Sequence, residues 1–463
     1  AGTTNLDIVD IDGAVDMATT LAVAGTSTFG GGTTIDNAGV LTLESGGNLT
    51  TAGGSDLNIV YPVNRSLFIK EAGTTAVTID NAQKVTLAGA LAVTGDYSST
   101  TSGTSNLRLG VNAGNSIASG GNYNVVLGDE AGTAITTGDQ NTFVGYAAGD
   151  VTTTSSNNTG IGNNALGGNI LGSYNVAIGK DSLEEMNPAT AVNMYNVAVG
   201  AAAGQKVTTG VENTIVGGLA GDALTDADYN VAIGYGALSS DTLGSRSVAI
   251  GRNALIAQNF TTATASNNTA VGYEAGRSTT TGIDNVLYGS NAGYALTDAD
   301  DNVALGRSAL ATDTLGSKST AVGNGALNAQ NFTTATDTYN TAVGYAAGND
   351  VTTGTGNTLI GAAAGDVLTD GDSNVAVGLA ALGSDTRGNF SVAIGVAALN
   401  SSNTTNDTNM YNVAVGHHAG TAVTTGTHNT LIGGLAGDAI TTGASNVAVG
   451  YGALTTDDVG QWN

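Results

Sequence analysis

The sequence predicts an all-β fold, a parallel β-roll or β-solenoid of about 20 coils preceded by an all-β fibrous shaft. The main observation is a ten-residue phrase, YNVAIGYGAL at Tyr229 to Leu238, which recurs in 20 copies between Ser105 and Leu454. The second observation is composition: 70 of the 463 residues are Gly, and aromatic residues make up only 5%. So few large side chains cannot build a wide core, whereas a solenoid needs only a thin one.

The copies follow a fixed spacing. After a first step of 18 residues, the central glycines recur in steps of 17, 17, 17 and 21, so the pattern closes every 72 residues, as from Gly128 to Gly200. Two further features share this period. The phrase ends in Gly, Gly, Leu, Leu in rotation, and the Asn that opens it is replaced by Ser at Ser247, Ser319 and Ser391. A short fixed period indicates one supersecondary unit per repeat, stacked on its neighbours.

Each phrase is expected to form one strand of one coil. From Asn230 onward the residues alternate large and small, which is strand periodicity, and β-branched residues favour a pleated surface. We expect Val231 and Ile233 to point inward and Asn230 to stack on its copies as a hydrogen-bonded ladder. Gly234 marks a turn with positive φ or a close backbone approach, and Ala237 marks a tightly packed position. At about 4.8 Å per coil, the rod would be roughly 95 Å long.

Four regions are expected along the chain. Residues 1–100 contain short alternating strands such as AVTIDNAQKVTLAGA between turns, and form a β-rich fibrous shaft that needs partner chains to fold. Residues 101–105 are a joint, and residues 106–454 are the β-solenoid repeat domain. Residues 455–463 are the start of a further segment, and Trp462 suggests that the natural chain continues.

Charge and chemistry exclude several classes of function. The net charge is −26, with 12 basic residues against 38 acidic ones, which argues against nucleic acid because phosphate binding relies on Lys and Arg. No apolar run reaches the roughly 20 residues of a membrane span. The histidines and carboxylates form no recognisable catalytic constellation, and no P-loop motif is present. We therefore expect a protein that is not an enzyme, does not insert into membranes and needs no cofactor other than, at most, calcium.

Pairs of aspartates in turns suggest calcium. The segments LTDAD, LTDAD and LTDGD each place two Asp two residues apart, at Asp226 and Asp228, Asp298 and Asp300, and Asp370 and Asp372. Such pairs can ligate Ca²⁺. The alternative is that the carboxylates accept hydrogen bonds from N–H groups of the turns. Because the pairs lie four coils apart, only pairs from different chains of an oligomer could share one ion.

The 21-residue steps predict four longer loops in a row along one side, at 184–194, 256–266, 328–338 and 400–410. Exposed loops on a rigid scaffold commonly carry function. We therefore expect receptor contact from amides and aromatics that face solvent, namely Gln258, Asn259, Phe260, Gln330, Asn331 and Phe332. The alternative is that the loops pack against a neighbouring chain or cover a coil edge, with both Phe side chains buried.

Tyrosines that follow the central glycines offer a second candidate surface. They could stack on sugar rings or simply cover the coil edge, and they are Tyr146, Tyr235, Tyr273, Tyr345 and Tyr451.

The phrase N-V-A-I-G-x-x-A resembles the coil motif in the head domains of trimeric autotransporter adhesins, which fold as left-handed parallel β-rolls and trimerise. The segments LAVAGTSTF and ALAVTGDYS resemble the shafts of bacteriophage tail fibres. Adhesin heads usually have coils shorter than the steps of 17 found here, and this chain shows neither stalk heptads nor C-terminal barrel strands. The resemblance therefore implies a homotrimeric virion protein that joins other tail proteins and binds a host-cell receptor such as a glycan.

Two alternatives remain open. The first is the head of a bacterial adhesin of the autotransporter type, located on the cell surface rather than on a virion. The second is an ice-binding solenoid, suggested by the abundance of Thr. A flat ice-binding face needs Thr at one fixed position of each coil, whereas Thr is expected here in variable connections such as 152–154, 208–209 and 352–353.

Overall fold

The computed structural model describes residues 67–71, 74–79, 85–87, 102–404, 406–456 and 458–460. The chain divides into two compact units, Ala1–Thr94 and Gly95–Asn463. In the first unit, three strands form an antiparallel sheet in the order β1-β2-β3: β1 (Leu67–Glu71), β2 (Thr74–Ile79) and β3 (Val85–Leu87). The shaft strands expected before β1, and Trp462, lie outside the described residues.

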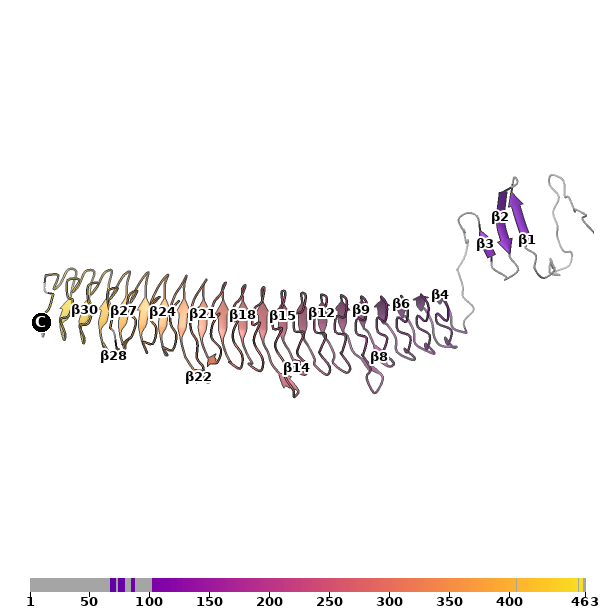
Figure 1. Cartoon of the computed structure of the whole chain (residues 1–463), viewed down its shortest axis with the longest axis horizontal. Helices are drawn as coiled ribbons and strands as arrows, with labels where there is room; N and C mark the ends of the chain where they lie inside the picture. Colours follow the sequence, from indigo (N-terminus) through magenta and orange to yellow (C-terminus); the bar gives the residue numbers. More distant parts are fainter. Residues whose placement is uncertain are drawn as a thin grey trace, which may run out of the picture. The chain divides into compact units, whose positions relative to one another are not determined.

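The second unit is an all-β parallel β-solenoid of about 20 coils, with no helix among its described residues (Figure 1). Each phrase contributes one three-residue strand, and consecutive strands pair in parallel and in register, as Val197 with Thr214 and Thr214 with Val231. One phrase therefore makes one coil, as predicted. The ladder strands are β4 (Leu107–Leu109), β5 (Val125–Leu127), β6 (Thr142–Val144), β7 (Thr159–Ile161), β9 (Val176–Ile178), β11 (Val197–Val199), β12 (Thr214–Val216), β13 (Val231–Ile233), β15 (Val248–Ile250), β17 (Thr269–Val271), β18 (Val286–Tyr288), β19 (Val303–Leu305), β21 (Thr320–Val322), β23 (Thr341–Val343), β24 (Thr358–Ile360), β25 (Val375–Val377), β27 (Val392–Ile394), β29 (Val413–Val415), β30 (Thr430–Ile432) and β31 (Val447–Val449).

The 21-residue coils each add a short parallel pair of two-residue strands at the base of the long loop. In Figure 1 the labelled strands of these pairs, β8, β14, β22 and β28, all lie along the same flank of the solenoid, so the predicted row of loops is present. The pairs are β8 (Gly172–Ser173) with β10 (Val192–Asn193), β14 (Gly244–Ser245) with β16 (Thr264–Ala265), β20 (Gly316–Ser317) with β22 (Thr336–Asp337), and β26 (Gly388–Asn389) with β28 (Thr408–Asn409).

The direction of the strand side chains differs from the prediction. In β13 the central Ala232 is fully buried, whereas Val231 and Ile233 are half-buried and lie on the opposite face of the strand. The inward expectation for these two residues is therefore wrong. The physical reason is volume: Ala237 and Leu238 of the same coil are also fully buried in the core, so the strand centre has room only for a small residue.

The asparagine ladder is present as predicted. The Oδ1 of Asn213 accepts the backbone N–H of Asn230 at 2.9 Å, and the Nδ2 of Asn213 donates to the carbonyl of Ala227 at 2.8 Å. Both Asn side chains are fully buried. Each Asn thus satisfies one backbone donor and one backbone acceptor of the next coil, which a buried apolar residue would leave unpaired.

The central glycines meet both demands expected of them. Gly234 has φ of +127°, and a Cβ built on it would lie 2.6 Å from the carbonyl oxygen of Gly251. A side chain would therefore be strained by its backbone conformation and would also collide with the neighbouring coil.

The Gly-Gly-Leu-Leu rotation compensates for core volume. A Cβ on Gly276 would lie 2.8 Å from Leu287 Cδ1, and a Cβ on Gly293 would lie 2.6 Å from Leu287 Cδ2. The two glycines therefore leave the space that one large strand residue fills, and the same happens every 72 residues. From β9 onward, the strand centre of the other coils is Ala. The large strand centres of this cycle are Phe143, Ile215, Leu287, Leu359 and Leu431, all fully buried.

Candidate functional site

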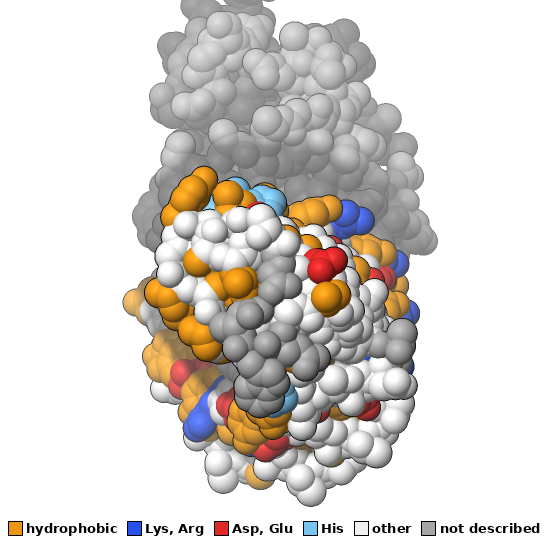
Figure 2. All heavy atoms as spheres, turned by 90° about the vertical axis from the view of Figure 1, so that its left-hand side faces the viewer, with side chains coloured by type: hydrophobic (Ala, Val, Ile, Leu, Met, Phe, Trp, Pro, Cys, Tyr) orange, Lys and Arg blue, Asp and Glu red, His pale blue; other side chains and the backbone are white. Residues whose placement is uncertain are grey.

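The outer face of the strand ladder is an uncharged stripe, which we call the outer stripe. It consists of the first and third residues of every ladder strand from β4 to β31, and all of these are Val, Ile, Leu or Thr except Tyr288. Many are partly open to solvent, for example Leu305 at 43% and Ile432 at 40%. In the end-on view of Figure 2, hydrophobic side chains gather toward the left of the rod, while uncharged polar side chains and backbone form most of the right and lower surface.

The long loops do not present the predicted contact residues to solvent. Gln258 and Gln330 are fully buried, and Phe260 and Phe332 are 6% and 7% exposed. The expectation of solvent-facing side chains is therefore wrong for these four, and the alternative in which the two Phe are buried describes the structure. Asn259 is exposed and Asn331 is half-buried. These two amides accept the hydroxyls of Thr242 and Thr314 at 3.2 and 3.1 Å.

Gln258 instead joins a buried polar network. Its Nε2 donates to Asp241 Oδ2 at 2.6 Å and to Ser247 Oγ at 2.9 Å, and its Oε1 accepts from Asn268 Nδ2 at 2.9 Å. Asp241 Oδ1 accepts the backbone N–H of Phe260 at 3.1 Å. The carboxylate is fully buried and needs these donors, because an unpaired buried charge is costly.

This network accounts for Ser in place of Asn at Ser247 and Ser319, whereas at Ser391 the equivalent loop residue is Ser402, which donates to Asp385 Oδ2 at 2.9 Å. The short side chain of Ser247 leaves room for Gln258 to enter the core from the loop, and the next cycle repeats the arrangement with Ser319 and Gln330, whose Nε2 donates to Ser319 Oγ at 2.8 Å. The matching periods of the Ser positions and the long loops were a signal of this contact in the sequence.

The aspartate pairs form hydrogen bonds between coils. Asp228 Oδ1 accepts the backbone N–H of Val211 at 2.8 Å, and Asp226 Oδ1 accepts the hydroxyl of Thr209 at 2.5 Å. Asp300 and Asp298 accept from Ile283 N and Thr281 Oγ1 in the same way. The third pair differs: Asp372 accepts from Thr355 N at 2.7 Å, while Asp370 forms an ion pair with Arg387 at 3.3 Å.

The acidic surface around the second pair is mutually repulsive. Partial burial, together with the nearby charges of Asp298, Asp301 and Asp284, raises the pKa of Asp300 above its usual value. Even so, no group of three or more His, Asp or Glu side chains converges on a position that could hold a metal anywhere in the part of the chain that the structure describes. Calcium binding by these pairs remains a prediction.

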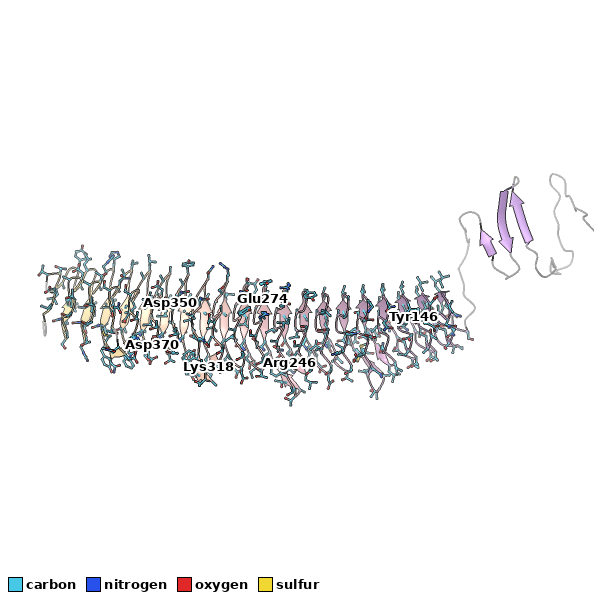
Figure 3. The ribbon with its side chains drawn as sticks, in the orientation of Figure 1. Tyr146, Arg246, Glu274, Lys318, Asp350 and Asp370 are labelled. Atoms are coloured by element: carbon cyan, nitrogen blue, oxygen red, sulfur yellow. The ribbon has the colours of Figure 1, made fainter. Side chains whose placement is uncertain are left out.

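A second row of side chains, which sequence reasoning missed, lies beside the loops. It consists of the residue just before each ladder Asn or Ser, from Tyr123 to Ser445, and we call it the left-handed edge. Its backbone φ is positive in coil after coil, for example 60° at Tyr229 and 64° at Arg246. This conformation costs an L-residue with a side chain about 1–2 kcal/mol, and Gly, as at Gly356, adopts it most readily. A stick view places Arg246, Lys318 and Asp370 on the flank that carries the loops (Figure 3).

A hollow of about 290 Å³ opens where this edge meets the second long loop. Asp226, Asp228, Tyr229, Ser245 and Arg246 line it on the coil side, and Ala263, Thr264 and Ala265 line it on the loop side. Among the described residues, the guanidinium of Arg246 has no ion-pair or hydrogen-bond partner.

The tyrosines after the central glycines are exposed, from 48% at Tyr273 to 83% at Tyr451. The guanidinium of Arg252 lies 5.8 Å from the ring centre of Tyr273 and 3.7 Å from Glu274. These contacts run between neighbouring coils, so part of this row covers the coil edge, which is one of the two roles expected for it.

Thr occupies a fixed position in most coils, contrary to the expectation of variable connections. Thr208 donates its hydroxyl to the carbonyl of Thr225 at 3.2 Å, and Thr225 donates to that of Thr242 at 3.0 Å. In the long coils Asn takes the same place, as at Asn259 and Asn331. The row is thus regular, but its hydroxyl donors are used for bonds between coils.

The architecture defines a class: a rod-shaped β-solenoid with an uncharged outer stripe and a row of exposed side chains beside it. No family model matches the chain, and no curated protein matches it. In the described residues no helix is long and apolar enough to cross a membrane.

Proposed function

We propose that this protein is a homotrimeric tail-fibre component of a phage virion, and that its solenoid serves attachment to host cells. The observation that carries the proposal is the outer stripe. Uncharged, mainly β-branched side chains line it over roughly 95 Å, and soluble monomers rarely leave so long an apolar surface open to water. Copies of the same chain fit it best, because their stripes have the same length and the same spacing.

The three-fold state rests on the resemblance to trimeric adhesin heads and is tested first. Light scattering coupled to size-exclusion chromatography should give three times the chain mass of 45.2 kDa. The double variant Ile233→Glu and Ile250→Glu places charges in the stripe and should dissociate or aggregate the protein. Ser240→Glu, at an exposed position away from the stripe, is the matched control. A stable, well-folded wild-type monomer would contradict the proposal.

Immunogold labelling tests whether the protein is located on the virion. Gold-conjugated antibodies against the purified solenoid should mark the tails of phage particles in electron micrographs of the virus fraction from the source sample. Labelling of bacterial envelopes without labelled virions would favour the adhesin-head alternative. In either case, purified protein should adsorb to host cells, and excess protein should compete with the native particle.

An ice-binding role is the remaining candidate because Thr is aligned at one position in most coils. Two features weigh against it: the Thr hydroxyls already donate hydrogen bonds to the next coil, and Asn replaces Thr at this position in every fourth coil. Thermal hysteresis and ice recrystallisation assays on the purified protein test it directly, and we expect no activity in either.

A further inference from the structure

The left-handed edge carries side chains that the fold does not require. Each position needs positive φ, which Gly adopts readily, and Gly356 shows that Gly is compatible with it. Yet bulky aromatic residues occupy the edge at several coils, including Tyr174, Tyr195, Phe390 and Tyr411. Because these residues make the backbone harder to form than Gly would, the backbone geometry of the edge does not explain their presence.

Five of the seven Tyr and Phe residues of the edge lie at the bases of the long loops, and the other two, Tyr123 and Tyr229, lie on other coils. Tyr174 and Tyr195, on adjacent coils, have ring centres 5.2 Å apart and are 44% and 50% exposed. Asn193 Nδ2 donates to the hydroxyl of Tyr195 at 3.3 Å. The two rings therefore form an exposed platform, flanked by an amide, where the first long loop rejoins the solenoid.

The fourth long loop has an equivalent platform. Phe390 and Tyr411 are stacked with ring centres 5.3 Å apart and an interplanar angle of 8°, and His428 continues the row 5.3 Å beyond Tyr411. Asn389 and Asn409, one in each strand of the pair at the loop base, contact each other at 3.4 Å. Three aromatic rings thus follow one another on successive coils, and amide side chains accompany the first two.

The second and third long loops can be compared residue by residue to see which positions are constant and which vary. The loop segment AQNFTTAT is identical in the second and third long loops, in keeping with its buried Gln and Phe. The edge residues at the bases of these loops differ: Arg246 and Asn267 in one, Lys318 and Tyr339 in the other. At the base of the third loop the edge residues already contact one another and their neighbours: Lys318 forms an ion pair with Asp337 at 2.5 Å and lies 5.5 Å from the ring centre of Tyr339. Between these two repeats the loop segment is constant and the edge varies.

We propose that the left-handed edge at the loop bases binds neutral oligosaccharides of hexose or N-acetylhexosamine units, with Tyr174 and Tyr195 as one platform and Phe390 and Tyr411 as another. A sugar ring offers an apolar C–H face for an aromatic ring and hydroxyl or acetamido groups for the flanking amides. The net charge of −26 disfavours polyanionic ligands. The inference rests on the proposed role in attachment, and it names the ligand class and the residues.

The inference is tested on the purified full-length oligomer with an array of neutral hexose and N-acetylhexosamine oligosaccharides. The variant combines Tyr174→Ser, Tyr195→Ser, Phe390→Ser and Tyr411→Ser, because Ser already occupies the edge with φ of 56° at Ser373. The matched control combines Gln140→Ser and Asp301→Ser, two exposed residues of the same edge that lie away from both platforms and have φ of 58° and 59°. Wild type and control should bind the same oligosaccharides, and the variant should bind them at least about tenfold more weakly.

Three results would overturn the inference: no binding to any neutral oligosaccharide, equal binding by wild type and variant, or loss of the oligomer in the variant as judged by light scattering and circular dichroism. The last would make the edge a contact between chains. Failure of the proposed function would give a different result: antibodies would not label virions, while the purified protein would still bind sugars through the edge. Labelled tails and cell adsorption without any sugar binding would refute the inference alone.

Discussion

Removing the Leu287 side chain tests the volume compensation that underlies the 72-residue period. Leu287→Ala deletes a fully buried side chain whose two methyl groups occupy the space beside Gly276 and Gly293. Those glycines have no side chains that could relax into the void. We therefore expect a cost in the upper part of the usual range for such a substitution, about 3–5 kcal/mol.

A second substitution should recover part of this loss. Gly293→Leu alone should destabilise by about 2–4 kcal/mol, because its Cβ would meet Leu287 and because φ is +56°. In the Leu287→Ala background the same Leu would fill the void, as Leu238 does beside Ala232. The double variant should cost only about 1–3 kcal/mol, since the space next to Gly276 stays empty.

Hydrogen exchange read out by mass spectrometry suits this test, because a long repeat array need not unfold in one step. Protection of the β18 amides should fall in each single variant and return in part in the double variant, with guanidinium unfolding of the whole protein as a second measure. If the two costs simply add, the Gly-Gly-Leu-Leu rotation has a different origin and the volume argument fails.

Three further predictions concern thermal unfolding of the purified protein. Gly234→Ala should lower stability more than Gly450→Ala. Both positions have a positive φ that strains Ala by about 1–3 kcal/mol, but only the Cβ at Gly234 meets a neighbouring coil. Equal melting temperatures of the two variants would contradict this close approach. Gln258→Ala should cost about 3 kcal/mol or more by leaving the buried network unpaired, and a loss below about 1 kcal/mol would show that water replaces the amide. Burial raises the pKa of Asp222, so the native state holds this proton more tightly than the unfolded state, and this carboxyl's contribution to stability rises as pH falls through the raised pKa toward the ordinary pKa of Asp. Asp222→Asn should therefore raise the melting temperature most at pH 7 and less as pH falls. Glu212→Gln, which removes the same charge from an exposed side chain, controls for the change in net charge.

The repeat made most of the architecture readable from the sequence. In a parallel stack each residue lies against its own copy, so a position that needs a ladder amide or a glycine shows the same letter coil after coil. The coil length, the buried Asn230 row, the Gly234 turn and the row of long loops all follow from that rule. The same rule made the 72-residue cycle visible in the sequence, although the volume compensation between glycines and large strand centres became visible only in the core.

Only the tertiary structure decided which way the side chains point. Alternation in a strand tells which residues share a face but not which face is inside, so Ala232 rather than Val231 turned out to fill the core. Likewise, the polarity of Gln258 predicted exposure, yet a ring of buried donors and acceptors from three neighbouring coils satisfies it. The left-handed edge was hidden for the opposite reason. Its residues share a backbone conformation but not a residue type. The positive φ common to Tyr229 and Arg246 therefore becomes visible only in the folded chain.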